Sequence, residues 1–244
     1  MIKPPLISVI VAVYNGANTL QQCIDSVLGQ TFAAVELIVM DGGSTDGTLA
    51  ILEKNACRLN YWESNKDRGI AHAWNKALAQ AHGDWILFIG SDDRLQDERV
   101  MADAAAVLSC DTISDVVYGQ LVFEGGPAHG LLMGCADNLI AMKRRMIIPH
   151  TAAFHRRTFF SEVGQFDETF RVAMDYEILL RKKALSASFM NRLVTIMGGE
   201  GVSSRLIRTT LLEGRAAQIK NKADWRIKIE AWHTFYQLRH QLNQ

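Results

Sequence analysis

The chain has 244 residues, of which 48% are hydrophobic and 21% are charged, enough for one large domain with a substantial core. Its 26 Lys and Arg balance 26 Asp and Glu, which argues against a general nucleic-acid-binding protein. The four cysteines lie far apart, so we expect reduced thiols rather than zinc or disulfides. The apolar run near the N-terminus is too short for a signal peptide, and later runs are shorter than the ~20 residues of a spanning helix. We therefore expect a cytoplasmic protein.

The first 110 residues alternate between strand and helix signals. Apolar runs typical of strands lie at residues 7–13, 37–40, 59–62 and 85–89. Apolar residues at helical spacing follow the first three, at residues 18–29, 48–54 and 70–81, and Asn18 is the expected N-cap of the first helix. This succession predicts right-handed crossovers and an α/β fold, with a mostly parallel, Rossmann-like sheet flanked by helices.

The alternation fades in the second half. Residues 116–118 and 121–123 could each form a strand, and a glycine-rich loop follows at residues 125–134. Neither a repeat nor a low-complexity linker separates the two halves. We therefore expect residues 1–110 and 111–205 to be the two halves of one domain, followed by a helical tail at residues 206–244.

Polar residues follow three of the predicted strands. Tyr14 follows the first strand, Asp41 the second, and the pair Asp92 and Asp93 the strand at residues 85–89. In a parallel sheet these strand ends lie on the edge where ligands of open α/β sheets bind. Tyr14 offers a flat face to a nucleobase and Asp41 can accept from ring N–H groups.

The two adjacent acids suit a nucleotide with its metal ion. Asp92 can accept hydrogen bonds from ribose hydroxyls, and Asp93 can hold Mg²⁺ or Mn²⁺ bridging a diphosphate. Each residue also has a structural alternative: Asp41 as a turn former and Asp92 as a helix cap. The combination at successive strand ends favours a nucleotide site.

Several segments together resemble family 2 glycosyltransferases of the GT-A fold. The donor-side segments are residues 7–15, 41–48 and 83–93, and the acceptor-side segments are residues 164–168, 175–181 and 198–204. The resemblance spans roughly residues 6–205. One departure is Gly90, where many members of that family carry another acid.

The resemblance implies an inverting, metal-dependent transfer of a sugar from a nucleoside-diphosphate donor, with a UDP-sugar favoured. The implied acceptor is a hydroxyl of a saccharide or lipid-linked saccharide, in surface polysaccharide or glycolipid biosynthesis. The cofactor would be Mn²⁺ or Mg²⁺. The donor residues carried over are Ala12, Tyr14 and Asp41 for the base, Asp67 and Arg68 for the ribose–diphosphate side, Asp92 for ribose, and Asp93 for the metal.

The same resemblance identifies Asp175 as the base that deprotonates the acceptor. The alternative is that Asp175 caps a helix over the following apolar residues, and Glu177 is the alternative base. His150 could touch the acceptor or the diphosphate. Arg156 and Arg157 are more typical of a solvated basic face.

The segment from residue 205 to residue 244 carries eight Lys and Arg against three Asp and Glu. Trp225, Ile229, Trp232 and Tyr236 follow one another at helical spacing. Such a helix could contact the inner face of an anionic membrane peripherally, pack on its own domain, or form a homodimer. We expect protein packing, with membrane contact as the alternative.

Two other functions share parts of this pattern. A sugar-phosphate nucleotidyltransferase would normally carry a basic, glycine-rich loop after the first strand, and residues 14–18 hold no Lys or Arg. A non-catalytic nucleotide-sugar-binding protein would need no base. A dinucleotide oxidoreductase is disfavoured because no predicted strand runs into Gly-x-Gly-x-x-Gly.

Overall fold

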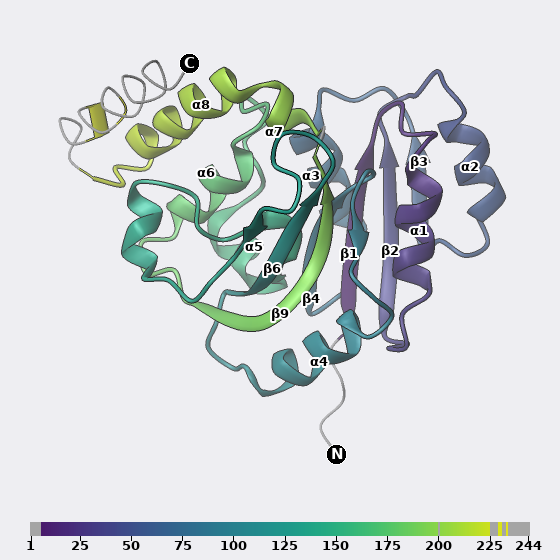
Figure 1. Ribbon diagram of the computed structural model, residues 1–244, viewed down its shortest axis with the longest axis horizontal. Coiled ribbons are helices and arrows are strands. Elements are labelled where there is room, and N and C mark those ends of the chain that lie inside the picture. Colours follow the sequence, from purple (N-terminus) through teal and green to yellow (C-terminus); the bar gives the residue numbers. More distant parts are fainter. Residues whose placement is uncertain (1–5, 200, 225–228, 231–232, 234–244) are drawn as a thin grey trace.

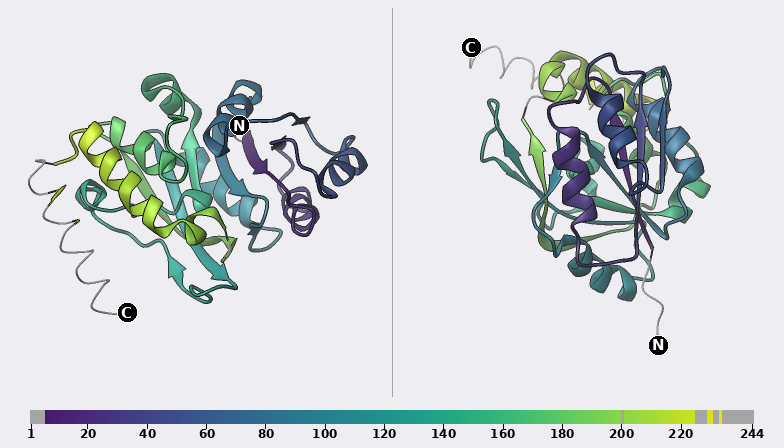
Figure 2. Two further views of the ribbon diagram at one scale, coloured as in Figure 1. Left: turned by 90° about the horizontal axis from the view of Figure 1, so that it is seen from above. Right: turned by 90° about the vertical axis from the view of Figure 1, so that its right-hand side faces the viewer.

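The computed structural model describes residues 6–199, 201–224, 229–230 and 233. A central sheet carries helices on both faces, and the two halves of the chain lie side by side along it (Figure 1, Figure 2). The strands are β1 (Ile7–Val13), β2 (Val35–Asp41), β3 (Tyr61–Ser64), β4 (Trp85–Gly90), β5 (Arg94–Leu95), β6 (Val116–Glu124), β7 (Leu132–Met133), β8 (Ala153–Arg156) and β9 (Ala187–Gly198). The α-helices are α1 (Leu20–Leu28), α2 (Thr48–Asn55), α3 (Ile70–Gln80), α4 (Val100–Cys110), α5 (Arg157–Val163), α6 (Met174–Arg181), α7 (Val202–Arg205) and α8 (Ile207–Lys220), and the 3₁₀ helices are η1 (Leu139–Lys143) and η2 (His150–Ala152).

The sheet has the order β3-β2-β1-β4-β8-β6-β9-β5, with β7 paired to β6. The strands β3, β2, β1 and β4 are parallel to one another, as the sequence predicts. Antiparallel β8 then joins β4 to β6, and β6 pairs with β9 in parallel. The strand order reverses at β1, which has β2 on one side and β4 on the other. In open α/β sheets, this is where ligands bind.

Alternating side chains of the central strands supply two separate cores. In β1, Val9 and Val11 face the core that contains residues of α1 and α4, while Ile10 faces the core that contains residues of α3 and α6. Strand β4 repeats the pattern, with Leu87 in the first core and Phe88 in the second. A strand buried on both faces must be apolar throughout, which explains the uninterrupted runs in the sequence.

The structure corrects two local predictions. Residues 116–124 form one strand, whose register against β9 shifts between Tyr118 and Leu121. Gly119 and Gln120 interrupt the apolar pattern there, and for this reason the sequence indicates two short strands instead of one. The first helix is preceded by Thr19 as its N-cap residue rather than by Asn18.

Part of the predicted tail lies outside the described residues. Helix α8 begins it, and Ile229 is buried, whereas Trp225, Trp232 and Tyr236 fall outside the described residues. The acceptor-side segment at residues 198–204 includes residue 200, which also lies outside the described residues. Among the helices that are described, none has the length and apolar character to cross a membrane.

Candidate functional site

The carboxyl ends of β1, β2 and β4 meet at one edge of the sheet. Val13 lies opposite Asp41, and Ala12 lies opposite Gly90. Tyr14 follows directly and is 65% exposed, so its ring is available to a ligand at this edge. We call this edge, with the loops that follow the three strands, the donor edge.

Asp41 is buried beneath the donor edge and organises its backbone. Its carboxylate accepts hydrogen bonds from the Ser44 backbone N–H at 3.1 Å and from the Ser64 hydroxyl at 2.6 Å. Ser44 Oγ in turn accepts from the backbone N–H of Asn15 at 2.7 Å, which joins the loops after β1 and β2. Asp41 therefore fulfils the turn-forming role expected of it as an alternative, and holds the loop beside Tyr14.

The loop before α3 contributes Asp67 and Arg68. A Cβ added to Gly42 would lie 2.8 Å from Asp67 Oδ2, so the glycine allows this carboxylate to reach the end of β2. Asp67 also accepts from the Gly69 backbone N–H at 2.9 Å. Arg68 is exposed and donates to Glu168 at 2.6 and 2.9 Å. This ion pair links the donor edge to the segment that leads into α6.

The paired acids after β4 differ sharply in their environment. Asp93 is only 3% exposed and accepts from the backbone N–H groups of Gly90 at 2.7 Å and Gly198 at 3.0 Å. Burial and the neighbouring carboxylate of Asp92 raise the pKa of Asp93 to about 7. Asp92 as a whole residue is exposed, but neighbouring atoms partly bury its carboxylate. This burial raises the pKa of Asp92, and the positive charge of Arg205 partly opposes the increase.

Glycines surround the Asp92 carboxylate. A Cβ on Gly90 would lie 2.7 Å from Asp92 Oδ1, and one on Gly198 would lie 2.6 Å from Asp92 Oδ2. The chain thus leaves room there only for the carboxylate itself. Gly90, the departure from the family pattern, is the residue that lets both acids pack at the end of β4.

The donor edge fits a divalent cation held jointly with a ligand. Within the described part of the chain, no three His, Cys, Asp or Glu side chains are grouped as a metal site. Magnesium, however, is commonly bound by one or two carboxylates together with substrate phosphates. Asp92 and Asp93 supply two such carboxylates, and a cation would stabilise the charged form of Asp93, which burial and the charge of Asp92 disfavour.

Asp175 lies in the first turn of α6, partly buried, and its Oδ1 accepts from the Tyr176 backbone N–H at 2.7 Å. Burial, together with the negative charge of Glu213, raises the pKa of Asp175 to about 6. Asp175 is not the cap of this helix, because the N-cap position belongs to Ala173. A carboxylate that titrates near neutrality can accept a proton from a hydroxyl group during catalysis.

The other acidic and basic candidates of the second half have structural partners. Glu177 is fully buried; burial alone would raise its pKa, but hydrogen bonds from Arg181, Lys220 and Asn221 hold it below the usual value. Its carboxylate is therefore committed to ion pairs and unsuited to act as a base. Arg156 stacks over Trp85 with 4.3 Å to the ring centroid.

His150 lies inside the second core rather than at the donor edge. Its ring stacks on Phe88 at 5.3 Å between centroids and lies 4.8 Å from that of Trp74. Burial lowers the pKa of His150 well below its ordinary value, so the ring is neutral. The expected contact of His150 with acceptor or diphosphate has no support from this position.

Two charged residues of the second half were not singled out from the sequence. Arg205, in α7, is a positive charge acting on Asp92, and Glu213, in α8, is a negative charge acting on Asp175. Neither belongs to a local motif, and both act across the fold. Only the three-dimensional structure brings them to the site.

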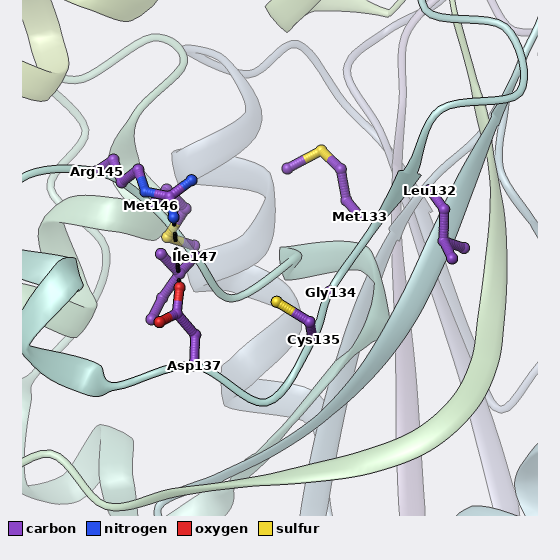
Figure 3. Close-up of a pocket in the computed structure, with 8 residues that line it drawn as sticks. All are labelled: Leu132, Met133, Gly134, Cys135, Asp137, Arg145, Met146 and Ile147. Atoms are coloured by element: carbon purple, nitrogen blue, oxygen red, sulfur yellow. Dashed lines mark hydrogen bonds and ion pairs between the residues drawn. The ribbon is translucent and has the colours of Figure 1, made fainter.

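A cavity of about 200 Å³ opens between two segments of the second half (Figure 3). It is lined by Leu132, Met133, Gly134, Cys135, Asp137, Arg145, Met146 and Ile147. The figure shows the ion pair of Asp137 and Arg145 on one side and Met133 and Cys135 on the other. The adjacent Met142 accepts a hydrogen bond through its carbonyl from Tyr176, which follows Asp175. The wall of the cavity is thus tied to the helix that carries Asp175.

Known proteins share both the sequence pattern and the fold. The model of glycosyl transferase family 2 matches residues 8–159. The PGL/p-HBAD biosynthesis glycosyltransferase of Mycobacterium bovis (strain BCG / Pasteur 1173P2) is 33% identical over 180 residues, which cover 72% of this chain and 69% of that protein.

Solved structures agree with this match at the level of the fold. The mannosyltransferase PcManGT of Pyrobaculum calidifontis, in complex with GDP-Man and Mn²⁺, superposes with a TM-score of 0.70 at 20% identity, over 95% of this chain and 70% of its own. TarS of S. aureus superposes with a TM-score of 0.67 at 24% identity, and the match covers 86% of this chain but only 39% of TarS. The chain belongs to glycosyl transferase family 2 and has the GT-A fold of its glycosyltransferases.

Proposed function

We propose that this protein is an inverting glycosyltransferase that moves a sugar from a nucleoside-diphosphate donor to a hydroxyl of a saccharide or lipid-linked saccharide. The observation that carries the proposal is Asp175, a partly buried carboxylate whose pKa is raised to about 6, in the segment that Arg68 and Glu168 tie to the donor edge. A base of this kind is what an attacking hydroxyl requires.

The donor would bind along the donor edge. Ala12, Tyr14 and Asp41 would surround the nucleobase, with the Tyr14 ring stacking on it. Asp67 and Arg68 would line the ribose and diphosphate, and Asp92 would accept from the ribose. A UDP-sugar is our preferred donor, supported by the complexes of TarS with UDP and UDP-GlcNAc, although PcManGT was solved with GDP-Man.

A divalent cation, Mn²⁺ or Mg²⁺, would be held by Asp93 together with Asp92. When bound, such an ion neutralises charge that develops on the leaving diphosphate. Mn²⁺ is present with UDP in glucosyl-3-phosphoglycerate synthase of Mycobacterium tuberculosis, a fold neighbour. Arg205 adds a positive charge beside the same acids and is positioned to attract a diphosphate.

The acceptor would lie on the α6 side, where the cavity of Figure 3 offers an apolar wall. The naming of the M. bovis relative as a PGL/p-HBAD biosynthesis enzyme supports an acceptor from glycoconjugate biosynthesis. We also propose a cytoplasmic protein whose residues 206–244 either contact the inner face of the membrane peripherally, which would suit a lipid-linked acceptor, or form a homodimer.

The donor is tested by thermal stabilisation. We expect one nucleoside diphosphate among UDP, GDP and dTDP to raise the melting temperature, and to do so only with Mn²⁺ or Mg²⁺, because ligands stabilise the state they bind. Equal stabilisation by all three without metal would contradict the proposed donor site.

The reaction is tested with Asp175→Asn. This change should lower release of the nucleoside diphosphate from the stabilising sugar donor by roughly 10²- to 10⁴-fold, the usual effect of losing a general base, while donor binding persists. Asp25→Asn, an exposed acid on α1 paired with Arg58, is the matched control and should retain full activity. Full activity in Asp175→Asn would show that Asp175 is not the catalytic base and would reject this mechanism.

A further inference from the structure

Helix α6 begins without a cap from its own sequence. Ala173 occupies the N-cap position and has no side chain that could accept from the first backbone N–H groups. Glu213, on α8, accepts from the three consecutive backbone N–H groups that lead into the helix. Its Oε1 binds Arg171 at 2.9 Å, and its Oε2 binds Val172 at 2.8 Å and Ala173 at 2.9 Å.

These three bonds fix the backbone immediately before Asp175. Asp175 is the second residue of α6, and its carboxylate accepts a hydrogen bond from the Tyr176 backbone N–H in the first turn. The direction of that first turn therefore decides where the carboxylate points. We propose that Glu213 is a positioning residue for the base, holding Asp175 for acceptor deprotonation by clamping residues 171–173 onto α8. The proposal rests on the function proposed above.

The remaining α6–α8 contacts serve the packing of the two helices. Gln218 donates to the Tyr176 hydroxyl at 2.9 Å. Lys220 bridges Glu177 at 2.8 Å and Asp167 at 2.6 Å. These bonds reach Tyr176, Glu177 and the loop at Asp167, and none of them binds the backbone at residues 171–173. Glu213 alone among them binds the backbone at residues 171–173.

The charges around Asp175 also indicate that Glu213 acts on this carboxylate. On α6 and in the loop before it, Glu177 is neutralised by Arg181 and Lys220, and Asp167 is paired with Lys220. Arg171 is exposed, and Glu213 binds its backbone N–H. Glu213 is the charge that acts on Asp175, and with burial it raises the pKa of that carboxyl. Glu213 thus both positions the base and favours its proton uptake.

The first test follows Asp175 directly and needs no substrate. In protein labelled with ¹³C at the aspartate carboxyls, Asp175→Asn assigns the Asp175 signal and the titration midpoint is read by NMR. Glu213→Gln keeps the shape and removes the charge, so the midpoint should fall by about half a pH unit or more. Glu213→Asp keeps the charge and should titrate close to the wild type. An unchanged midpoint in Glu213→Gln, together with wild-type exchange and turnover in Glu213→Ala, would overturn the proposal.

The second test follows the clamp and the reaction. Hydrogen–deuterium exchange at residues 168–176 should quicken in Glu213→Ala, and donor turnover should fall by roughly tenfold to a hundredfold with unchanged donor affinity, since small misplacements of a catalytic group are costly. Lys220→Met is the matched control for exchange: it removes other bonds between the same two helices, so exchange at residues 171–173 should stay close to that of the wild type.

The outcomes separate this inference from the proposed function. If Asp175→Asn keeps full turnover, both fail. If Asp175→Asn is inactive while Glu213→Gln and Glu213→Ala match the wild type in midpoint, exchange and turnover, only the positioning role of Glu213 is rejected.

Discussion

Gly90 determines how the two acids at the end of β4 are packed. Its backbone N–H binds Asp93 at 2.7 Å, and the space its Cβ would occupy is taken by the Asp92 carboxylate. Where the family pattern puts an acidic side chain, this chain has none to accommodate. The two acids pack against this glycine, with Asp93 buried and Asp92 at the surface.

Gly90→Ala should therefore weaken donor binding. The added Cβ would lie 2.7 Å from Asp92 Oδ1 and 3.1 Å from Asp93 Oδ2, so one or both carboxylates must move. We expect the affinity for UDP with Mn²⁺, or for whichever diphosphate binds, to fall at least about tenfold by calorimetry, equivalent to about 1.4 kcal/mol. Gly214→Ala, whose Cβ has no described atom within 4 Å, is the control and should bind normally. Equal affinity in both variants would mean that the acids are not held as tightly as the packing indicates.

The sequence indicates some candidate site residues and hides others for a physical reason. Tyr14, Asp41 and Asp92 could be predicted to lie near one another because each stands at or just after the end of an apolar strand, and parallel strands end on one edge. Glu213 could not, because its bonds reach back some forty residues to the backbone at residues 171–173, and its neighbours read as an ordinary helix. A residue that binds a backbone segment distant in sequence forms no motif of characteristic spacing, so the sequence alone does not identify it.

At the scale of elements, α8 carries a weak point of its own. Gly214 lies in the middle of the helix, one residue after Glu213, and glycine costs helix stability because it has more freedom to lose on folding. The helix nevertheless supports α6 through Glu213, Gln218 and Lys220.

Gly214→Ala should stabilise the protein by about 0.5–1 kcal/mol, the difference in helix propensity between the two residues. The free energy of unfolding in urea measures it. Gly119→Ala in β6 is the contrasting variant, because its Cβ would lie 2.5 Å from the Arg192 carbonyl oxygen and should destabilise the sheet. A loss of stability in Gly214→Ala would indicate that the helix is packed more closely at that residue than the described contacts allow.

Elements differ in how readily their sequences predict them. Strands β1 and β4 were predictable because both faces are buried and their residues are apolar throughout. Strand β6 appeared as two because its centre is a register shift against β9. Strands β5 and β7, two residues each, depend on their partners and carry no pattern of their own.

At the scale of the whole molecule, one sheet unites the two halves predicted from the sequence. Strand β5 belongs to the first half but pairs with β9 at the far edge of the sheet. Arg192 of β9 binds Asp97 at 2.6 Å and Asp103 at 2.9 Å, so α4 is also fixed to the second half. The family and fold predictions are confirmed, but this return of the chain across the sheet could not be read from local signals.

Stability should depend on pH through the buried histidines. His155 is fully buried, and burial lowers its pKa to about 4. The unfolded chain takes up the proton near pH 6.5, so the stability contributed by neutral His155 is present above that pH and is lost as the pH falls toward 4. The loss from this residue is at most about 3 kcal/mol. Asp93 and Asp175, whose pKa values are raised, act in the opposite direction over the same range.

The comparison of two variants isolates the histidine. His155→Leu, similar in volume and unable to titrate, should lose less stability than the wild type between pH 7 and pH 4, measured by chemical denaturation at each pH. The exposed His129, changed to Gln, should follow the wild type. Parallel curves for all three proteins would show that His155 is protonated without cost.

Because α8 follows the donor edge in the sequence, the order of synthesis affects when the base is positioned. Folding during translation proceeds from the N-terminus, so residues 7–93, which form the donor edge, leave the ribosome long before Glu213 does. A nascent chain, or one clipped before α8, would then retain a nucleotide sugar while its base remains unclamped. Turnover would reach its full rate only when α8 docks, so an unfinished chain would consume activated sugars more slowly than the finished enzyme.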